Sequence, residues 1–329
     1  MTDNNGVNKI KVLVLDDDPT REAAYRQMEE NGEIEVDFQC LKDKDTSTVI
    51  HGLSAESPDI IFVDHRLDKT STDSANFMRT GKCVTPILRE KWSRPPILGV
   101  TAAKKACLEH DGNSFYEEVF DFGDISQLED FVRPIVNGYL SLGGNSDAVQ
   151  FVNLLNAPES EVESILHSIP DELRTLESDT FKHAMYRWFR RTLHGHAGFL
   201  YGKEWVAVTM GINMEDIDSF IDTFGCAKYA GIWADPSEIR WWKKRLYEIA
   251  IRERSSPREL VQSAACRFLG VKPAQYSKCH KCGKQWPEIL AFSDDSILTK
   301  LVPAHLECSM PHPKRYLSHS FEEPRIIIE

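Results

Sequence analysis

Short apolar runs alternate with longer amphipathic stretches over the first 140 residues, and this alternation limits the fold more than any other feature of the chain. The five runs are residues 10–15, 34–40, 59–64, 96–101 and roughly 116–122. Several are continuously apolar over four to six positions, which is typical of strands buried on both faces. Helices are predicted between them, near residues 20–31, 44–54, 72–91, 102–111 and 125–139. The pattern predicts an α/β domain, a doubly wound parallel five-stranded sheet covered by helices.

Polar side chains follow the predicted strands at the ends where parallel sheets bind ligands. Asp16 and Asp17 follow the first run, Asp64 ends the third, and Thr101 ends the fourth. Carboxylates gathered at one edge repel one another unless a cation lies between them, and Mg²⁺ is a hard cation that prefers oxygen ligands. A carboxylate beside such an ion can act as a nucleophile toward a phosphoryl group, and a nearby hydroxyl can donate a hydrogen bond to the transferred group.

Residues 9–139, about two fifths of the chain, resemble the receiver domain of two-component response regulators. The resemblance rests on four residues that stand in order at the predicted strand ends. It implies that Asp16 and Asp17 bind Mg²⁺, that Asp64 is the phosphoacceptor, and that Thr101 is the switch hydroxyl. It also implies a histidine kinase or another protein as the partner of this receiver-like domain.

The same stretch departs from the family pattern in two places. Receivers carry a Lys, usually followed by Pro, after strand five, whereas residues 118–124 contain no basic residue. Lys104 and Lys105, just past Thr101, are candidates to replace it. The loop at residues 68–76 also lacks the usual Pro and Gly. Two interpretations stay open, an active phosphoacceptor domain or a pseudo-receiver that keeps the fold as a docking platform. Acids that merely end the strands of an unrelated α/β protein explain the combined pattern less well.

The apolar spacing between residues 147 and 266 is mostly helical, which predicts a mainly α-helical domain. One helix is expected over residues 181–193, with aromatic side chains on one face and His183 among arginines on the other. A second helix is expected from residue 236 to residue 254. A short helix that ends at a glycine is expected within residues 200–212.

Two features of the helical region are candidates for binding. The second helix carries a basic cluster that consists of Arg240, Lys243, Lys244, Arg245, Arg252 and Arg254. Basic and aromatic side chains together can bind nucleic acid, although we favour a solvated charged face over an aromatic core. His183, His194 and His196 are candidate metal ligands, but a helix that ends at Gly195 explains them as well and is favoured. No Ser or Cys of this region stands in a recognisable nucleophile motif.

The C-terminal segment carries the most specific motif. Cys279 and Cys282 form a Cys-x-x-Cys pair, and after a gap of 22 residues His305 and Cys308 form a His-x-x-Cys pair. Two close pairs can converge on a tetrahedral centre, and thiolates with one imidazole suit Zn²⁺. Four ligands with no open position predict a structural zinc rather than a catalytic one. Gly283 permits a tight turn directly after the second Cys.

This motif resembles zinc-ribbon and treble-clef modules in general, without fixing a family. His280 and His312 are rival ligands with poorer spacing. A metal would supply folding free energy to a segment that is poor in aliphatic residues. Lysines beside the thiols favour an anionic partner such as nucleic acid, while bracing of the neighbouring domain is an equal alternative. Residues 326–328 are predicted either to add a strand to a sheet edge, in this chain or in a partner, or to pack as a plain terminus.

Charge divides the chain, whose formal net charge is −12. Residues 1–140 hold 16 basic and 26 acidic side chains, a net of −10, whereas residues 182–315 hold 21 basic and 14 acidic, a net of +7. We therefore predict a receiver-like domain at 1–140, a helical domain at 147–266, and a zinc-binding module with the tail at 267–329.

No apolar run approaches the length of a membrane span, and the N-terminus lacks the core of a signal peptide. A cytoplasmic protein with reduced cysteines and no membrane partner is expected.

Together these features predict a signalling regulator rather than an enzyme, with at most self-phosphotransfer onto Asp64. The receiver-like domain would sense phosphorylation or a partner, and the helical and zinc-binding half would deliver the output. The alternative is an adaptor, in which a pseudo-receiver docks a protein and the zinc module binds nucleic acid or another subunit. An enzyme hidden in the helical domain is a third hypothesis, against which the lack of a clustered acid, base or nucleophile counts.

Overall fold

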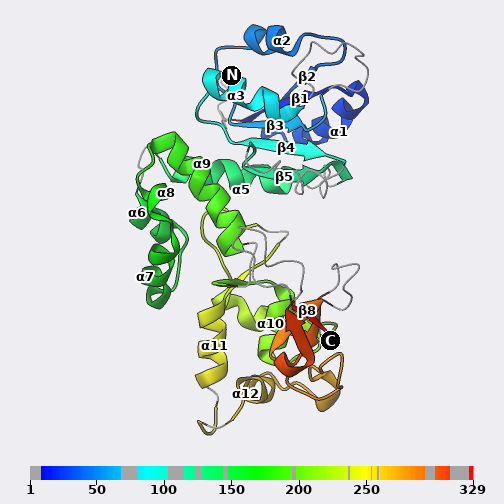
Figure 1. Cartoon of the computed structure of the whole chain (residues 1–329), viewed down its shortest axis with the longest axis vertical. Helices are drawn as coiled ribbons and strands as arrows, with labels where there is room; N and C mark the ends of the chain where they lie inside the picture. The colour runs from blue at the N-terminus through cyan, green and yellow to red at the C-terminus, as the bar shows by residue number, and fades with distance from the viewer. Residues whose placement is uncertain are drawn as a thin grey trace, which may run out of the picture. The chain divides into compact units, whose positions relative to one another are not determined.

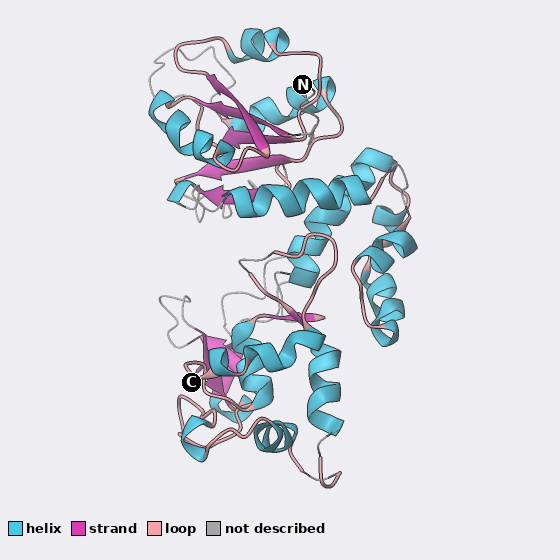
Figure 2. Cartoon of the chain, turned by 180° about the vertical axis from the view of Figure 1, so that it is seen from behind, coloured by secondary structure: helices cyan, strands magenta, loops and turns pink. Residues whose placement is uncertain are grey.

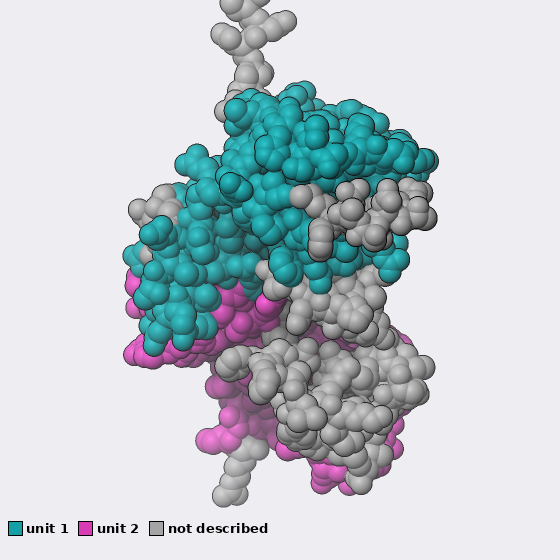
Figure 3. All heavy atoms as spheres, turned by 45° about the horizontal axis from the view of Figure 1, so that its top comes forward, with its two compact units in different colours: residues 1–147, 170–187 teal, residues 148–169, 188–329 magenta. Residues whose placement is uncertain are grey.

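The chain forms two compact units, which Figure 3 shows in different colours. The computed structural model describes residues 9–67, 80–102, 115–123, 128–143, 147–194, 198–235, 238–252, 254–257, 259–292, 301–311 and 326–328. Unit 1 comprises residues 1–147 and 170–187, and unit 2 comprises residues 148–169 and 188–329. The predicted division into three domains stays a prediction, because contacts within one chain define the units and do not report independent folding.

Unit 1 is built on a five-stranded sheet, which Figure 1 shows together with its helices. The strands are β1 (Ile10–Asp16), β2 (Ile34–Cys40), β3 (Ile60–Asp64), β4 (Ile97–Thr101) and β5 (Glu118–Asp121). Every neighbouring pair is parallel, and the order is β2-β1-β3-β4-β5. The predicted doubly wound parallel sheet is therefore confirmed. The strand order reverses between β1 and β3, which is where such sheets bind their ligands.

Helical segments join these strands close to the predicted positions. They are η1 (Pro19–Arg21), α1 (Glu22–Arg26), η2 (Gln27–Glu29), α2 (Thr46–Gly52), α3 (Gly81–Lys91) and α5 (Leu128–Ser141). Side chains cap two of them: Asp18 accepts a hydrogen bond from the backbone N–H of Thr20, and Asp45 accepts one from that of Thr48. These caps satisfy donors that a first turn leaves unpaired. The helix predicted near 102–111 lies, beyond its first residue, outside the described residues.

Both faces of the sheet are covered, which explains the continuous apolar runs. On one face, Leu15 and Val63 belong to a buried cluster with Leu88 of α3. On the other face, the Tyr25 ring of α1 lies 6.3 Å from the Phe62 ring, centroid to centroid. Full burial of one such side chain contributes roughly 1.5–3 kcal/mol. Strands covered in this way have no polar face, so their sequences do not alternate.

Two further helices of unit 1 come from later in the sequence, α8 (Asp171–Arg174) and α9 (Ser178–Trp188) except its last residue. The prediction that His183 lies on the polar face of this helix is wrong, because the structure buries its side chain at 6% exposure. Its Nε2 lies 2.8 Å from the carbonyl oxygen of Ser93, and its Nδ1 lies 3.2 Å from the hydroxyl of Tyr139. Contacts with other elements of unit 1 thus override the pattern within one helix.

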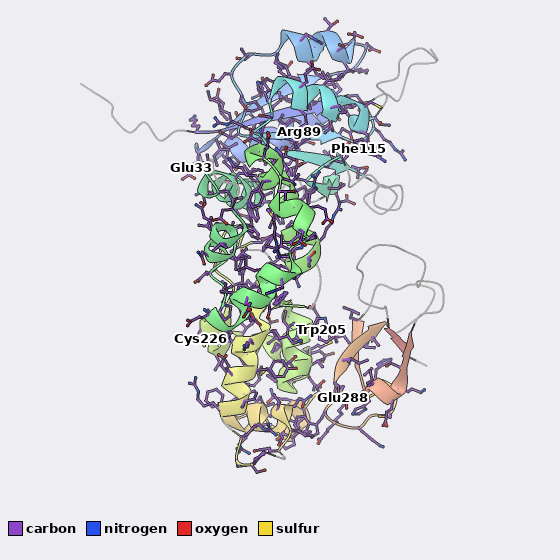
Figure 4. All side chains as sticks on the ribbon, turned by 60° about the vertical axis from the view of Figure 1, so that its left-hand side comes forward. Glu33, Arg89, Phe115, Trp205, Cys226 and Glu288 are labelled. Carbon is purple, nitrogen blue, oxygen red and sulfur yellow. The ribbon has the colours of Figure 1, made fainter. Side chains whose placement is uncertain are left out.

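Glu117, the residue before β5, is at the centre of these contacts. It accepts hydrogen bonds of 2.5 Å from Arg89 of α3, which Figure 4 labels, and from the backbone N–H of Ile97. Its other carboxylate oxygen lies 3.8 Å from Arg187 and 3.7 Å from His183, both on α9. The side chain of Glu117 is 1% exposed. A buried carboxylate is therefore paired with guanidinium groups from two helices.

Unit 2 is mainly helical, as Figure 2 shows by colour and as predicted for the C-terminal half. Its helices are α6 (Ala148–Leu154), α7 (Glu159–Ser168), the π-helix η5 (Phe189–His194), α10 (Lys203–Met210), η6 (Ile217–Ser219), η7 (Ile221–Ala227), α11 (Lys243–Arg252), α12 (Val261–Phe268), η8 (Pro273–Gln275) and η9 (Leu306–Cys308). Helix α10 ends as predicted at a glycine, Gly211, whose φ of +74° favours that residue. Of the helices described in either unit, none is long and apolar enough to cross a membrane.

One predicted helix is wrong in its first part. A helix was expected over residues 236–254, but Trp241–Trp242 form the strand β7, which pairs antiparallel with β6 (Leu200–Tyr201). Helix α11 begins only after this strand, and residues 236–237 lie outside the described residues. Trp242 is fully buried, and its ring lies 5.7 Å from that of Tyr229. Burial of two large rings thus favours the extended conformation over helical spacing.

Four short strands near the C-terminus form a separate sheet in the order β10-β11-β8-β9. They are β8 (Ile289–Phe292), β9 (Leu301–Ala304), β10 (Ser309–Pro311) and β11 (Ile326–Ile328). The tail strand β11 pairs antiparallel with β10 and parallel with β8. The tail therefore adds a strand to a sheet of this chain, which is one of the two predicted alternatives, but the strand lies between β10 and β8 and not at an edge.

Candidate functional site

The carboxyl ends of β1 and β3 bring three carboxylates together. These strands are parallel neighbours, so Asp16 and Asp64 end adjacent strands. One carboxylate oxygen from each of Asp16, Asp17 and Asp64 lies within 4.8 Å of the others. The three residues, which we call the acid cluster, are 0%, 9% and 3% exposed. Negative charge is therefore concentrated in a nearly buried place, at the predicted edge of the sheet.

Thr101 reaches the same edge from β4. It directly follows Val100, which is opposite Asp64 in the register of β3 and β4, and it is 3% exposed. The residue thus stands on the strand next to the one that carries Asp64. Its role as a switch hydroxyl stays a prediction.

Arg21 has no counterpart among the predicted site residues, yet its guanidinium lies in the acid cluster. Its Nη1 is 3.2 Å from Oδ2 of Asp16 and 3.2 Å from Oδ2 of Asp64. Its Nε is 3.8 Å from a carboxylate oxygen of Asp18, and its Cζ is 4.3 Å from the centroid of the Phe122 ring. The available signal in the sequence was the position of this arginine in the first turn after the acidic end of a strand.

A cation therefore lies beside strand β5 although the strand supplies none. Residues 115–123, which include β5, contain no basic side chain. Phe122 directly follows the strand, and the guanidinium of Arg21 covers its ring. Among the described residues, Arg21 brings a positive charge to this edge from the turn after β1. Residues 104–105, the lysines predicted as replacements, lie outside the described residues, as does the loop at 68–76.

Burial and mutual repulsion change the acidity of the acid cluster. Burial, together with the charge of Asp16, raises the pKa of Asp64 to about 7, although Arg21 opposes this shift. Burial also raises the pKa of Asp16, against the hydrogen bond from the backbone N–H of Asp18 and the charge of Arg21. Within the described part of the chain, three carboxylates face one guanidinium, which leaves a formal excess of two negative charges. A divalent cation would balance them.

The donor set fits a hard divalent cation. All three residues offer carboxylate oxygens, the ligand type that Mg²⁺ prefers. Within the described part of the chain, Oδ1 of Asp17 and the hydroxyl of Tyr25 are buried without a hydrogen-bond partner. Buried polar atoms are nearly always paired with protein, water or an ion. The binding of Mg²⁺ by Asp16 and Asp17 stays a prediction, which these observations support.

A second cluster joins Cys279, Cys282, His305 and Cys308, the four predicted zinc ligands. One ligand atom from each lies within 4.8 Å of the others. The Sγ of Cys282 is 3.3 Å from Nδ1 of His305. A tight turn shapes the first pair, since Gly283 has a φ of +70° and donates a backbone hydrogen bond to Cys279. The spacing of the two pairs thus predicted correctly that these side chains converge on a place that could hold a metal ion.

The imidazole of His305 is oriented as that of a metal ligand would be. Its Nε2 lies 3.0 Å from the carbonyl oxygen of Gln285, which can only accept a hydrogen bond, so Nε2 carries a proton and Nδ1 faces the thiols. Burial raises the pKa of the Cys279 thiol. Hydrogen bonds from backbone N–H groups, first that of Cys282, outweigh this effect and lower the pKa to about 6. Burial lowers the pKa of His305, while the thiols and Gln285 raise it to about 9. Metal binding would therefore release a proton from Nδ1.

Of the other candidate histidines, those that the structure describes do not converge with further ligands. His280 does not belong to the cluster of four, and His312 lies outside the described residues. Across the ranges that the structure describes, His183 and His194 join no group of metal-ligating atoms, and His196 is not described. His194 is 2% exposed, and burial lowers its pKa to about 2. These observations favour packing of histidines in the core over a metal site.

Two of the basic side chains of α11 contact carbonyl oxygens of unit 2. Lys244 donates a hydrogen bond of 3.1 Å to the carbonyl of Ser160, and Arg245 donates one of 3.3 Å to the carbonyl of Cys226, which Figure 4 labels. These contacts favour the interpretation in which the basic side chains form a charged face and the aromatic side chains beneath it form the core. Binding of nucleic acid by this basic cluster stays a prediction.

Comparison with known proteins finds solved structures alone. No family model matches the chain, and no curated protein matches it. The receiver domain of the Francisella response regulator 1452 is 18% identical, with 39% of this chain and 98% of that chain covered and a TM-score of 0.31. A LuxR-family response regulator from Aurantimonas sp. SI85-9A1 is 17% identical over 40% of this chain and 86% of its own, with a TM-score of 0.32. The RcsB response regulator of Salmonella typhimurium is 14% identical over 66% and 90%, with a TM-score of 0.33.

Such low identities and TM-scores carry no argument about activity. The receiver-like fold of unit 1 rests on its own geometry, the parallel strand order β2-β1-β3-β4-β5 with three carboxylates at the edge where the order reverses. Unit 2 is mainly helical and contains the Cys₃His cluster.

Proposed function

We propose that this chain is a regulator of the two-component type, in which Asp64 accepts a phosphoryl group and the C-terminal half delivers the output. One observation carries the proposal: three carboxylates and one guanidinium meet at the ligand-binding edge of a receiver-like sheet. Thr101, at the end of the neighbouring strand, supports it, because a hydroxyl there can hydrogen-bond a transferred group. The partner is a histidine kinase, for which a small phosphodonor can substitute.

In the proposed reaction, a carboxylate oxygen of Asp64 attacks the phosphorus atom of the donor. A new O–P bond forms while the bond between phosphorus and the donor atom breaks, and its electron pair stays with the donor. For a phosphohistidine donor, that atom is a ring nitrogen, which leaves as neutral imidazole when the other ring nitrogen is protonated. The attack needs an ionised Asp64, and the guanidinium of Arg21 at 3.2 Å favours that form.

Asp16 and Asp17, together with Asp64, would hold Mg²⁺. The bound ion supplies positive charge that offsets the oxygens of the transferred group. The chain itself supplies a site that is largely shielded from water, because Asp16, Asp17 and Asp64 are each at most 9% exposed. A phosphoryl group adds about two negative charges, and in this low-dielectric place such a change acts strongly on its neighbours. We infer that it shifts unit 1 between two states.

A second candidate function is a docking platform that is never phosphorylated. One observation favours it, the guanidinium of Arg21 that already pairs with both Asp16 and Asp64. Such a resident cation can replace a metal ion as the partner of the carboxylates. Under this hypothesis unit 1 binds a protein without regard to phosphate analogues.

We also propose that Cys279, Cys282, His305 and Cys308 bind one structural zinc ion. The donor set consists of three thiols and an imidazole whose Nδ1 faces them, which is a ligand set typical of structural zinc. The small core around it supports this, because among the described residues the buried cluster consists of Cys279, Cys308, Ala291 and Ala304, with Ile289 packed against it. A core of this size does not fold a module without a further source of free energy.

Thermal melting with Mg²⁺ and beryllium trifluoride, a mimic of the aspartyl phosphate, tests the phosphoacceptor proposal. Wild type is compared with Asp64→Asn, and Asp37→Asn is the matched control because it makes the same change at an exposed position of the sheet. Binding to the native state must raise the melting temperature. The proposal expects a rise in wild type and Asp37→Asn that is absent in Asp64→Asn. No rise in any of the three proteins would refute it and leave the docking platform.

A further inference from the structure

The acid cluster has a built-in cation, and its placement is specific. Within the described residues, the ion pairs of Asp16 and Asp64 go to the same atom, Nη1 of Arg21, at 3.2 Å each. The arginine side chain is 12% exposed. A surface arginine would pair with one carboxylate in water and gain little. This arginine instead bridges the two strand ends whose carboxylates the proposed function uses.

Several contacts hold the guanidinium in place before any ligand binds. Asp18 caps the turn η1 by accepting hydrogen bonds from the backbone N–H and the hydroxyl of Thr20, at 3.0 and 2.6 Å. Its other carboxylate oxygen lies 3.8 Å from Nε of Arg21. The guanidinium also lies 4.3 Å above the ring of Phe122, a distance at which a cation is attracted to the aromatic face. The side chain of Arg21 is therefore already ordered, and it loses little conformational entropy when an anion binds.

Transfer of a phosphoryl group would change what Arg21 contacts. Asp64 would lose its carboxylate charge on one oxygen and gain a group that carries about two negative charges. The new oxygens would lie next to Oδ2 of Asp64 or to its partner oxygen, and Nη1 of Arg21 is 3.2 Å from Oδ2. A planar guanidinium matches phosphoryl oxygens well, because two of its N–H groups can donate in parallel.

We propose that Arg21 binds the phosphoryl group on Asp64 and so supplies the positive charge that strand β5 does not. The inference rests on the proposed function, because it assigns a ligand to the same site. In the unphosphorylated chain Arg21 pairs with Asp16 and Asp64, and after transfer its guanidinium donates to the phosphoryl oxygens instead. The role requires a positive charge and a planar group with parallel N–H donors at this position, and a lysine can provide only the charge.

Mg²⁺ and beryllium trifluoride together make the role testable, because Arg21 should weaken the binding of Mg²⁺ and strengthen the binding of beryllium trifluoride. Mg²⁺ alone meets repulsion from the guanidinium, so Arg21→Gln should bind Mg²⁺ more tightly than wild type. Beryllium trifluoride with saturating Mg²⁺ should bind at least about tenfold more weakly to Arg21→Gln, because one charge-assisted contact is lost. A variant that merely disturbed the fold would weaken both ligands together.

The experiment measures both affinities by titration calorimetry for wild type, Arg21→Gln, Arg21→Lys and Asp64→Asn. Arg26→Gln is the matched control, because Arg26 lies one turn further on and forms ion pairs with Glu22 and Glu29, outside the acid cluster. Arg21→Lys should fall between wild type and Arg21→Gln in affinity for beryllium trifluoride. Arg26→Gln should match wild type.

Each result decides between the two proposals. If wild type, Arg21→Gln and Arg21→Lys bind beryllium trifluoride equally while Asp64→Asn does not, the role of Arg21 is overturned and the phosphoacceptor assignment stands. If wild type itself does not bind it, the proposed function fails and the role of Arg21 fails with it. Should Arg21→Gln not fold, Arg21→Lys decides alone, since an affinity equal to that of wild type overturns the proposal.

Discussion

Replacing Glu117 by Gln should destabilise unit 1, because it weakens the contacts that hold α9 against the other elements of this unit. The carboxylate is 1% exposed and accepts 2.5 Å hydrogen bonds from Arg89 and from the backbone N–H of Ile97. Its second oxygen lies within 4 Å of Arg187 and His183. A Gln side chain keeps one acceptor oxygen but turns an N–H₂ group toward these cationic or donor groups, so at least one guanidinium loses its charge partner.

The expected cost is roughly 2–4 kcal/mol, between the loss of a charged hydrogen bond and the loss of one partner of a buried ion pair. Urea unfolding measures it as a lower midpoint with an unchanged slope. The matched control is Glu33→Gln, because Glu33 pairs with Arg133 where both side chains are 47% exposed, and such pairs contribute about 0–1 kcal/mol. If Glu117→Gln cost no more than this control, the buried network would not be what holds α9.

Three further predictions concern other parts of the molecule. Burial raises the pKa of the Glu161 carboxyl to about 7, so the folded chain binds this proton more tightly than the unfolded chain, and the free energy of unfolding should fall as the pH rises from about 5 to 7. Glu161→Gln should flatten that part of the profile, and an unchanged profile in urea unfolding would refute the assignment. Gly99→Ala would place a Cβ 2.8 Å from the buried ring of Tyr116 and should cost about 1–3 kcal/mol, whereas Gly52→Ala, with no atom within 4 Å of its Cβ, should not destabilise the chain. Metal analysis should find one zinc ion per chain that Cys308→Ser loses together with several degrees of melting temperature; a metal-free wild type with the same melting temperature as the variant would contradict the zinc site.

The sheet of unit 1 could be predicted from the sequence because strands that are buried on both faces consist of continuous apolar runs. Strands such as Ile60–Asp64 are apolar throughout and end in a carboxylate, and parallel neighbours carry their ends to one edge. The reversal of strand order therefore brought Asp16 and Asp64 together as expected. The Cys₃His cluster was predictable for a similar reason, since ligand spacing within each pair is local in sequence.

What could not be predicted depends on contacts between distant segments. Arg21 is a single basic residue in a short turn, and no periodic pattern in the sequence indicates that its guanidinium bridges two strand ends. His183 fits a polar helix face by spacing, but a carbonyl from Ser93 and a hydroxyl from Tyr139 hold it in a buried place. Trp241–Trp242 precede a helical pattern and form a strand, because their rings are buried beside other aromatic side chains.

Mass spectrometry of the intact chain after incubation with a small phosphodonor and Mg²⁺ tests the central claim most directly. We predict that wild type gains the mass of one phosphoryl group, that peptide mapping places it on Asp64, and that Asp64→Asn gains none. Wild type that stays unmodified, or a variant that is modified as fully as wild type, would contradict the assignment of Asp64 as the phosphoacceptor.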